Sequence, residues 1–157
     1  MTSLIDALNA RLLGVLADHP RIGVSDLARH LGVSVPTARD RLRRLEETGV
    51  IRGYRVDVDP AALGVGVGVW VRVRPGPGQL TRVAELAAAT PEVTECHRIS
   101  GDDCFLMRVQ VPSIEAVETV LDRFLLHGQT VSSFIVSTPV PPRIPPIPPH
   151  TFGSVSI

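Results

Sequence analysis

Apolar residues recur at helical spacing in three stretches within residues 4–49, which predicts three helices. The first helix ends before Pro20, because proline lacks the backbone donor that a helix interior needs. The second is a short helix over residues 26–31, capped by Ser25 and ended by Gly32. The inward-facing residues of these two helices are Leu4, Ile5, Leu8, Leu12, Val15, Leu16, Leu27, Ala28 and Leu31.

The third helix, residues 34–49, is the most informative stretch of the chain. Ser34 is a favourable N-cap and Gly49 a favourable C′ residue, so the segment is predicted to be one complete helix. At ~1.5 Å per residue it is about 20 Å long, more than the ~12 Å width of a DNA major groove. Its apolar stripe consists of Val35, Ala38, Leu42 and Leu45. The opposite face and the flanks carry Pro36, Thr37, Arg39, Asp40, Arg41, Arg43, Arg44 and Glu47.

Four arginines lie within residues 39–44 of this helix. One interpretation is an ordinary solvated face whose ion pairs are Asp40–Arg44 and Arg43–Glu47. The other is a DNA-recognition helix. A short helix, a glycine-containing turn and a longer basic helix are typical of the helix-turn-helix motif, and we favour this second interpretation.

The residues that follow, 50–56, are rich in β-formers and contain a bend at Arg52-Gly53, which predicts a small wing. The formal net charge of the chain is zero, but the charged residues are unevenly distributed between its two parts. Residues 1–56 contain nine Arg against six acidic residues, whereas residues 57–157 contain seven Arg against ten acidic residues. Because basic charge belongs where phosphates bind, residues 1–56 are predicted to be a winged helix-turn-helix DNA-binding domain.

After a linker at residues 57–64, the apolar pattern changes to a period of two. Residues 63–74 form a predicted strand, with valines from Val65 to Val73 on one face and Gly66, Gly68, Trp70, Arg72 and Arg74 on the other. The later elements are a helix from Leu80 that Pro91 closes, strands at 93–99 and 104–111, a helix capped by Ser113 and ended by Gly128, and a strand at 131–137. The order β-α-β-β-α-β predicts a ferredoxin-like domain over residues 65–138, and an α+β protein overall.

Helices cover only one face of such a sheet. Gly66 and Gly68 weaken a strand unless another group packs close to its backbone. One explanation is that these glycines relieve crowding beneath a helix. The explanation we favour is that the sheet of another subunit covers the open face, with Trp70 at or beside the contact.

The last part of the chain, residues 139–157, is a proline-rich tail, with seven prolines among residues 139–149. Such a run excludes helix and central strand and favours extended polyproline II structure. It is either a disordered tail or a strut packed on a neighbouring subunit.

Several functional classes are excluded by the sequence. It contains neither a membrane-spanning apolar stretch nor the pattern of a signal peptide, so we expect a cytoplasmic protein with no membrane partner. Cys96 and Cys104 are then expected to be free thiols. Together with His97 they do not predict a metal site, because strand alternation places Cys96 and His97 on opposite faces. Neither a phosphate-binding glycine loop nor a nucleophile motif is present, so no cofactor and no catalytic residue are predicted.

Three segments together resemble one known family. They are Ser25-Asp-Leu-Ala-Arg-His-Leu-Gly-Val-Ser34, the run from Arg41 to Ile51 followed by Gly53-Tyr54, and Glu95-Cys-His-Arg-Ile-Ser-Gly-Asp102. These segments are similar to the Lrp/AsnC (feast/famine) transcription factors, and the resemblance extends from about residue 4 to residue 137. It implies a regulator of transcription that binds double-stranded DNA. It also implies an effector domain that dimerises through its sheets, giving a homo-dimer or a higher even oligomer.

The expected DNA contacts lie on the third helix. Arg39, Arg43 and Arg44 are expected to contact DNA, whereas Arg41 lies nearer the apolar stripe and is a flanking or packing residue. The expected DNA-binding set is Ser34, Pro36, Thr37, Arg39, Asp40, Arg43 and Arg44. The family often has Pro and then Ser or Thr after the capping Ser, whereas this chain has Val35 and then Pro36.

The resemblance also implies an amino-acid effector, bound beside the loop after the second strand of the effector domain. The expected effector-binding residues are Ser100, Gly101, Asp102, Asp103, Cys104 and Ser132. The alternative is a tight hairpin with solvated aspartates. Cys104 stands where the family often has a second acid, and Ser132-Ser-Phe134 stands where it often has Thr-x-Thr. These changes make the pocket less polar, so we expect a hydrophobic or aromatic amino acid, or another small effector, rather than asparagine or lysine.

An enzymatic alternative comes from the same fold. Siroheme decarboxylases resemble Lrp/AsnC proteins in both domains, so the fold alone does not exclude catalysis. Such an enzyme needs His, Tyr and Arg groups around an acidic tetrapyrrole, and the single tyrosine of this chain, Tyr54, lies in the predicted wing. We therefore predict a regulator rather than an enzyme.

Overall fold

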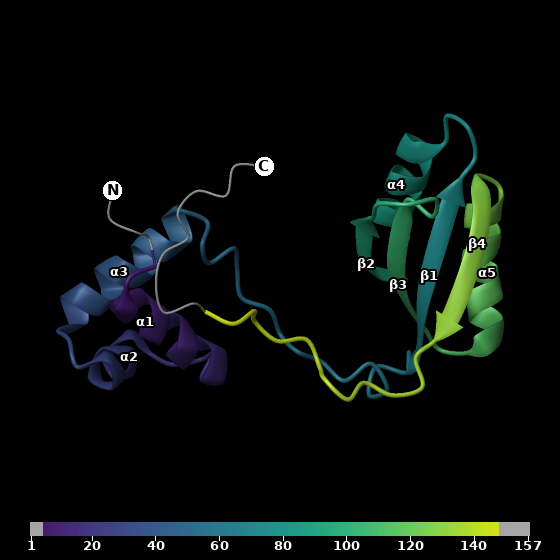
Figure 1. Cartoon of the computed structure of the whole chain (residues 1–157). Helices are drawn as coiled ribbons and strands as arrows, with labels where there is room; N and C mark the ends of the chain where they lie inside the picture. The colour runs from purple at the N-terminus through teal and green to yellow at the C-terminus, as the bar shows by residue number, and fades with distance from the viewer. Residues whose placement is uncertain (1–4, 148–157) are drawn as a thin grey trace. The chain divides into compact units, whose positions relative to one another are not determined.

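A computed structural model describes residues 5–147 of the chain. These residues fall into two compact units, residues 5–56 together with 142–147, and residues 57–141. Among its described residues the first unit contains helices but no strand, and the second contains a four-stranded sheet and two helices. Figure 1 shows both units. Predictions that concern Leu4 or residues 148–157 lie outside the described residues.

The first unit confirms the predicted helix-turn-helix arrangement. Its helices are α1 (Ala7–Asp18), α2 (Val24–Leu31) and α3 (Val35–Glu47). Their apolar stripes meet in a small core that contains Leu12, Leu27, Leu31 and Leu45. Because this core uses only one side of each helix, the opposite side of α3 is left in solvent.

Two local predictions in this unit are wrong. Ser25 does not cap α2: the N-cap is Gly23, whose carbonyl accepts the N–H of Leu27 at 2.9 Å. Residues 50–56 contain no strand, so the wing does not form a β-ladder. The β-forming side chains are used differently, because Val50 and Ile51 pack on the helical core and Ile51 N–H returns to the carbonyl of Leu45 at 2.9 Å.

The second unit confirms the predicted ferredoxin-like order. Its elements are β1 (Val67–Pro75), α4 (Leu80–Ala89), β2 (Val93–Arg98), β3 (Phe105–Val111), α5 (Ile114–Leu125) and β4 (Gly128–Phe134). The strands lie in the order β2-β3-β1-β4, and every neighbouring pair is antiparallel. The α+β class is therefore confirmed for the chain.

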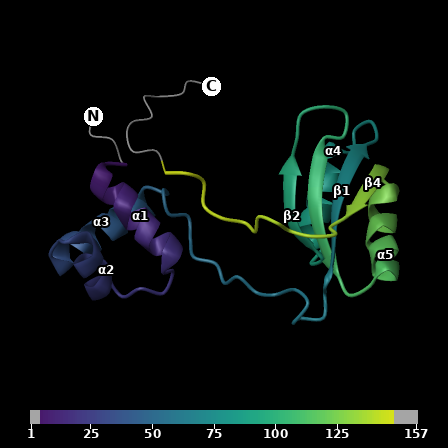
Figure 2. The ribbon, with the colours of Figure 1, turned by 60° about the horizontal axis from the view of Figure 1, so that its bottom comes forward.

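The predicted alternation of β1 decides where the core of this unit lies. Val69, Val71 and Val73 are fully buried, and the residues opposite them on β3 are buried as well. The helices α4 and α5 supply the other half of the core and lie on this face of the sheet (Figures 1 and 2). Trp70 and Arg72 project from the opposite face, which no helix covers in the part of the chain that the structure describes.

Two glycines differ in role from the predictions. Gly128 does not end α5, which stops at Leu125; it begins β4 three residues earlier than predicted. A Cβ at Gly128 would lie 2.8 Å from Cα of Pro75, so only glycine lets β4 start against the end of β1. At Gly68 a Cβ would meet Gln110 and Ile135 of the same chain, each at 3.2 Å, so neither a helix nor a partner is needed to explain this glycine.

Residues 139–147 of the tail carry neither helix nor strand, as the prolines predict. Among residues 5–147, no helix has the length and apolar character that crossing a bilayer requires.

Candidate nucleic-acid interface and effector loop

The start of α3 is held by local hydrogen bonds. Gly32 ends α2 with a left-handed conformation (φ 70°), and the chain turns within two residues to Ser34. As predicted, Ser34 is the N-cap: its Oγ accepts the N–H of Thr37 at 3.3 Å and contacts the Thr37 hydroxyl at 2.8 Å. Pro36 occupies the first turn, where its missing N–H costs no hydrogen bond. Ser34, Pro36 and Thr37 are all exposed at this end of the helix.

Arg41 points to the inside of the unit. Its Nη1 lies 2.6 Å from Oδ2 of Asp6 and 3.0 Å from Oδ1 of Asn9, both on or beside α1. The hydrogen bond from Arg41 holds the pKa of the Asp6 carboxyl below its usual value. Arg41 therefore ties α3 to α1, in agreement with its prediction as a packing residue.

Arg43 lies between two carboxylates of its own helix. Its Nη2 is 2.8 Å from Oδ1 of Asp40, and its Nη1 is 3.6 Å from Oε1 of Glu47. The hydrogen bond to Asp40 raises the pKa of Arg43, and the charge of Glu47 acts in the same direction. Of the two ion pairs named for a solvated face, that of Arg43 with Glu47 is present, whereas Asp40 pairs with Arg43 and not with Arg44.

Arg39 and Arg44 are the uncommitted cations of α3. Both are exposed, and within residues 5–147 neither guanidinium has an ion pair or a hydrogen bond. The predicted set thus divides into two free arginines and one arginine paired with acids. Arg39 and Arg44 can therefore bind an anionic partner without first breaking an ion pair within the protein.

Sequence reasoning missed a contact at the far end of α3. The hydroxyl of Tyr54 donates to Oε1 of Glu46 at 2.8 Å. Burial and the neighbouring Glu46 carboxylate raise the pKa of Tyr54 to about 12. The pair fixes the segment after α3 against the helix, and its eight-residue separation follows no helical spacing that could have predicted it.

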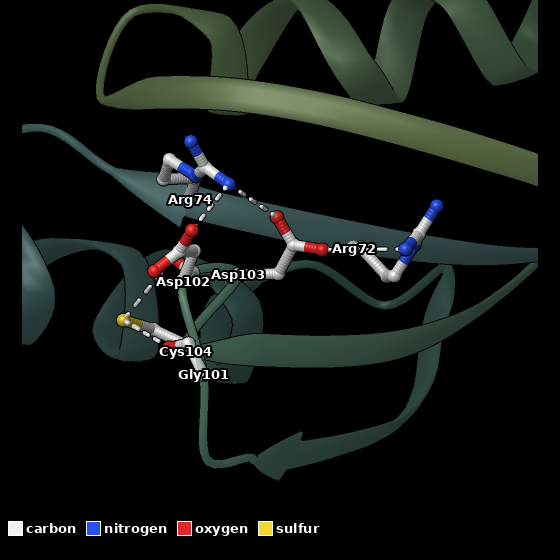
Figure 3. Close-up of polar contacts among 6 residues, drawn as sticks. All are labelled: Arg72, Arg74, Gly101, Asp102, Asp103 and Cys104. Atoms are coloured by element: carbon white, nitrogen blue, oxygen red, sulfur yellow. Dashed lines mark hydrogen bonds and ion pairs between the residues drawn. The ribbon is translucent and has the colours of Figure 1, made fainter.

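The predicted effector loop lies between β2 and β3 and carries a network of opposite charges (Figure 3). Oδ2 of Asp102 is 3.2 Å from Nη2 of Arg74. Asp103 lies between two arginines of β1, at 3.4 Å from Nη1 of Arg72 and 3.7 Å from Nη2 of Arg74. The aspartates are therefore ion-paired to the sheet rather than merely solvated.

The loop backbone is bent at both ends of this network. Gly101 has φ 102°, and Cys104 has φ 28°, the only positive φ of a non-glycine residue in the described part of the chain. The Cys104 thiol donates to the carbonyls of Gly101 and Asp102, at 3.9 and 3.7 Å (Figure 3). The carbonyl of Cys104 accepts the N–H of Ile99 at 2.8 Å, which closes the loop around the exposed Ser100.

Ser132 does not join the loop within one chain. It lies on β4 opposite Val71, so both side chains are on the helix-covered face of the sheet. Arg72 and Arg74, which hold the loop, project from the other face. The register of β4 against β1 therefore separates Ser132 from the other predicted effector residues.

Arg72 and Arg74 were not predicted as partners of the loop, although the sequence contains the signal. Alternation places both on the open face of β1, and the predicted topology pairs β1 with β3, where the loop ends. Val73 is opposite Phe105, so the end of β1 lies beside the loop.

The prediction that Cys96 and His97 lie on opposite faces is confirmed. Cys96 is opposite Met107 on the helix-covered face, and His97 is opposite Leu106 on the open face. Burial raises the pKa of the Cys96 thiol. The His97 ring is 2.5 Å from Oε1 of Glu95.

Comparison with known proteins places both halves of the chain. Residues 5–52 match the profile of a winged helix-turn-helix DNA-binding domain, and residues 67–145 match that of the Lrp/AsnC ligand binding domain. The proline dehydrogenase transcriptional activator of Rhodobacter capsulatus is 33% identical over 141 residues, which cover 86% of this chain and 92% of that protein.

Solved structures give the same picture. B. subtilis LrpC aligns with a TM-score of 0.82 at 28% identity, covering 85% of this chain and 96% of the other. The feast or famine regulatory protein from M. tuberculosis, solved with L-methionine, aligns with a TM-score of 0.83 at 30% identity, covering 88% of this chain and 97% of the other.

Proposed function

The chain belongs to the Lrp/AsnC family of transcriptional regulators, and we propose that it binds specific sites in double-stranded DNA and responds to an amino-acid effector. The observation that carries the DNA-binding part is the exposed side of α3. Its two uncommitted guanidinium groups, Arg39 and Arg44, stand on the second helix of a helix-turn-helix motif. A regulator with these features acts by binding rather than by catalysis.

The proposed contacts divide by chemistry. Arg39 and Arg44 bind phosphates, and Arg43 joins them at the DNA surface. Pro36, Thr37 and Asp40 lie near base edges, because the N-terminal half of a recognition helix enters the major groove. The capped end of α3 at Ser34 approaches a phosphate with its backbone donors.

A salt series tests this assignment. The full chain is first used to select bound sites from genomic fragments, and the affinity of the best site is then measured at several salt concentrations. Arg39→Ala and Arg44→Ala are each expected to weaken binding and to lower the salt slope by about one unit, because each removes one phosphate contact. Arg82→Ala, which removes an exposed arginine of α4, is the matched control and should leave both quantities unchanged. Unchanged slopes for both α3 variants would contradict the assignment.

The effector part rests on the charge network of the loop. An α-amino acid carries an ammonium and a carboxylate group, and the loop offers both complements: Asp102 for the ammonium group and Arg74 for the carboxylate. The M. tuberculosis relative was solved with L-methionine, which supports an apolar amino acid here as well. Cys104 in place of a second acid favours the same class.

Calorimetry separates the candidate effectors. Leucine, methionine and phenylalanine are expected to bind the full chain more tightly than asparagine and lysine. Asp102→Asn should remove most of the binding, because the ammonium group loses its charged partner, whereas Asp122→Asn, an exposed acid of α5, should not. Tight binding of lysine alone would show the expected chemistry of the pocket to be wrong.

We also propose that two chains associate through the open face of the sheet. That face carries Trp70, Leu106 and Val131, and Val131 keeps 48% of its surface exposed. Light scattering is expected to give a multiple of 16.9 kDa for the native chain. Val131→Lys should shift the mass toward one chain by burying a charge opposite Arg72. Val136→Lys, at a position outside the sheet that is 96% exposed, should not. A native monomer at micromolar concentration would refute the association.

A further inference from the structure

An acid stands at an unusual place on α3. Asp40 is the sixth residue of the helix, and its side chain is 66% exposed. Recognition helices contact base edges with residues of their N-terminal half, where phosphates of both strands flank the groove. An unpaired carboxylate is repelled from such a surface, so its presence needs a compensating contact.

Arg43 supplies that compensation. Its guanidinium lies 2.8 Å from Oδ1 of Asp40, which leaves Oδ2 without a hydrogen bond to any residue that the structure describes. The charge of Arg43 offsets that of Asp40, although Glu47, 3.6 Å from Arg43, leaves the three side chains with one net negative charge. Asp40 keeps one free acceptor beside the remaining donors of Arg43. The guanidinium beside Asp40 reduces the repulsion that an isolated carboxylate would meet at a DNA surface.

The chemistry of the major groove decides which base pair suits Asp40 and Arg43. An ionised carboxylate can only accept hydrogen bonds. Guanine offers only acceptors in the major groove, and thymine offers an acceptor and a methyl group. Adenine places an acceptor, N7, beside its N6 donor, whereas cytosine offers its N4 donors alone. The guanine paired with that cytosine presents O6 and N7, which are acceptors for a guanidinium.

We propose that Asp40, oriented by Arg43, is a specificity-determining residue that selects a cytosine–guanine base pair in the operator. Its free oxygen accepts from N4 of cytosine, while Arg43 faces the paired guanine. The inference rests on the proposed function, because it assumes that α3 enters the major groove.

Glu47 provides a matched control on the same helix. It is the second acid beside Arg43, at 3.6 Å, and its side chain is 61% exposed. It is also the last residue of α3, seven positions after Asp40, which places it about 10 Å further along the helix at ~1.5 Å per residue. Neutralising Glu47 therefore changes the net charge by the same amount without changing the residue near the base edges.

The experiment is selection of bound sites from a random DNA library. The full chain is compared with Asp40→Asn, Asp40→Ala and Glu47→Gln, and helix content is checked by circular dichroism. The native chain should enrich a cytosine at one position in each half-site. Asp40→Asn should change the preference at that position alone, toward adenine, which matches a side-chain amide. Asp40→Ala should lose discrimination there by about tenfold or more, and Glu47→Gln should keep the native preference.

The outcomes separate this inference from the function on which it rests. If the native chain enriches no sequence, the proposed function itself fails. If the native chain selects a site and both Asp40 variants select the same one, Asp40 does not specify a base and only this inference is overturned. The same holds if Glu47→Gln alters the cytosine position, because a general charge effect would then explain the change.

Discussion

At the scale of single residues, the arginines of α3 differ in role because some contact acceptor groups of the protein and others do not. Arg41 meets Asp6 and Asn9 from α1, whereas Arg44 meets no carboxylate in the described part of the chain. A guanidinium held by two acceptors of another segment contributes to the stability of the unit. A free guanidinium contributes to binding of an anionic partner.

Replacing Arg41 by alanine should therefore affect stability, whereas replacing Arg44 by alanine should affect DNA binding. Arg41→Ala is expected to lower the stability of the first unit by about 1 kcal/mol, or about 5 °C in the unfolding midpoint, because it removes the hydrogen bonds that join α3 to Asp6 and Asn9. Arg44→Ala should leave stability unchanged and weaken DNA binding. Thermal unfolding followed by circular dichroism, together with DNA titration, measures both effects. Equal stability losses for the two variants would show that the contact with α1 is not a tie between the helices.

Asp6 also gives this unit a defined response to acid. The Arg41 guanidinium and the N–H of Asn9 hold the pKa of Asp6 below its ordinary value of 3.8. A carboxyl with a lowered folded-state pKa stabilises the fold above its unfolded value, and this contribution is lost as the pH falls through the folded value. The native chain should therefore lose stability below about pH 4 more steeply than Asp6→Asn. Unfolding midpoints of both chains from neutral pH downward test this, and parallel curves would contradict it.

At the scale of elements, the contact between β4 and β1 depends on one glycine. A Cβ at Gly128 would lie 2.8 Å from Cα of Pro75, and both backbones are held in a sheet, so neither can move away cheaply. Gly128→Ala is expected to destabilise the second unit by about 2 kcal/mol.

Gly14→Ala is the control, because nothing lies within 4 Å of its added methyl group and alanine favours the interior of α1. That variant should be as stable as the native chain or more stable, by about 0.5–1 kcal/mol. Denaturant unfolding measures both changes, and an unaffected Gly128→Ala would show that the strand ends can separate without cost.

The elements also show which features follow from sequence. The N-caps Ser34 and Ser113 and the alternation of β1 were predicted correctly, because each depends on residues within one turn or one strand. The β-strands of the wing were predicted wrongly, because Val50 and Ile51 pack on the helical core, which includes residues far away in the sequence. The partnership of Arg41 with Asp6 spans 35 residues and needs the packed structure to become visible.

The candidate sites divide in the same way. The exposed side of α3 and its pair of Arg43 with Glu47 could be predicted from helical spacing, but the choice of Arg43 rather than Arg44 as the partner of Asp40 could not. The loop could be placed by topology, whereas its partners Arg72 and Arg74 required the register of β1 against β3. Ser132 was grouped with the loop by resemblance, and the register of β4 separates them within one chain.

At the scale of the whole molecule, the chain joins a unit with a recognition helix to a unit with a charged loop. If an effector at the loop changes the affinity for DNA by some factor, DNA must change the affinity for that effector by the same factor. This reciprocity needs no assumption about how the two units are arranged. The coupling can therefore be measured either as the effect of effector on DNA affinity or as the effect of DNA on effector affinity.

The last prediction is that the two factors agree. Effector affinity is measured by calorimetry with and without saturating operator, and operator affinity is measured with and without saturating effector. We expect both ratios to be equal and about tenfold, within the usual range of coupling between sites. Asp102→Asn should remove the effect of the effector on DNA binding while leaving DNA binding alone intact, because Asp102 lies on the loop and not on α3. If effector and operator both bind and neither alters the affinity of the other, the chain binds two ligands independently and the proposed coupling between the two sites is refuted.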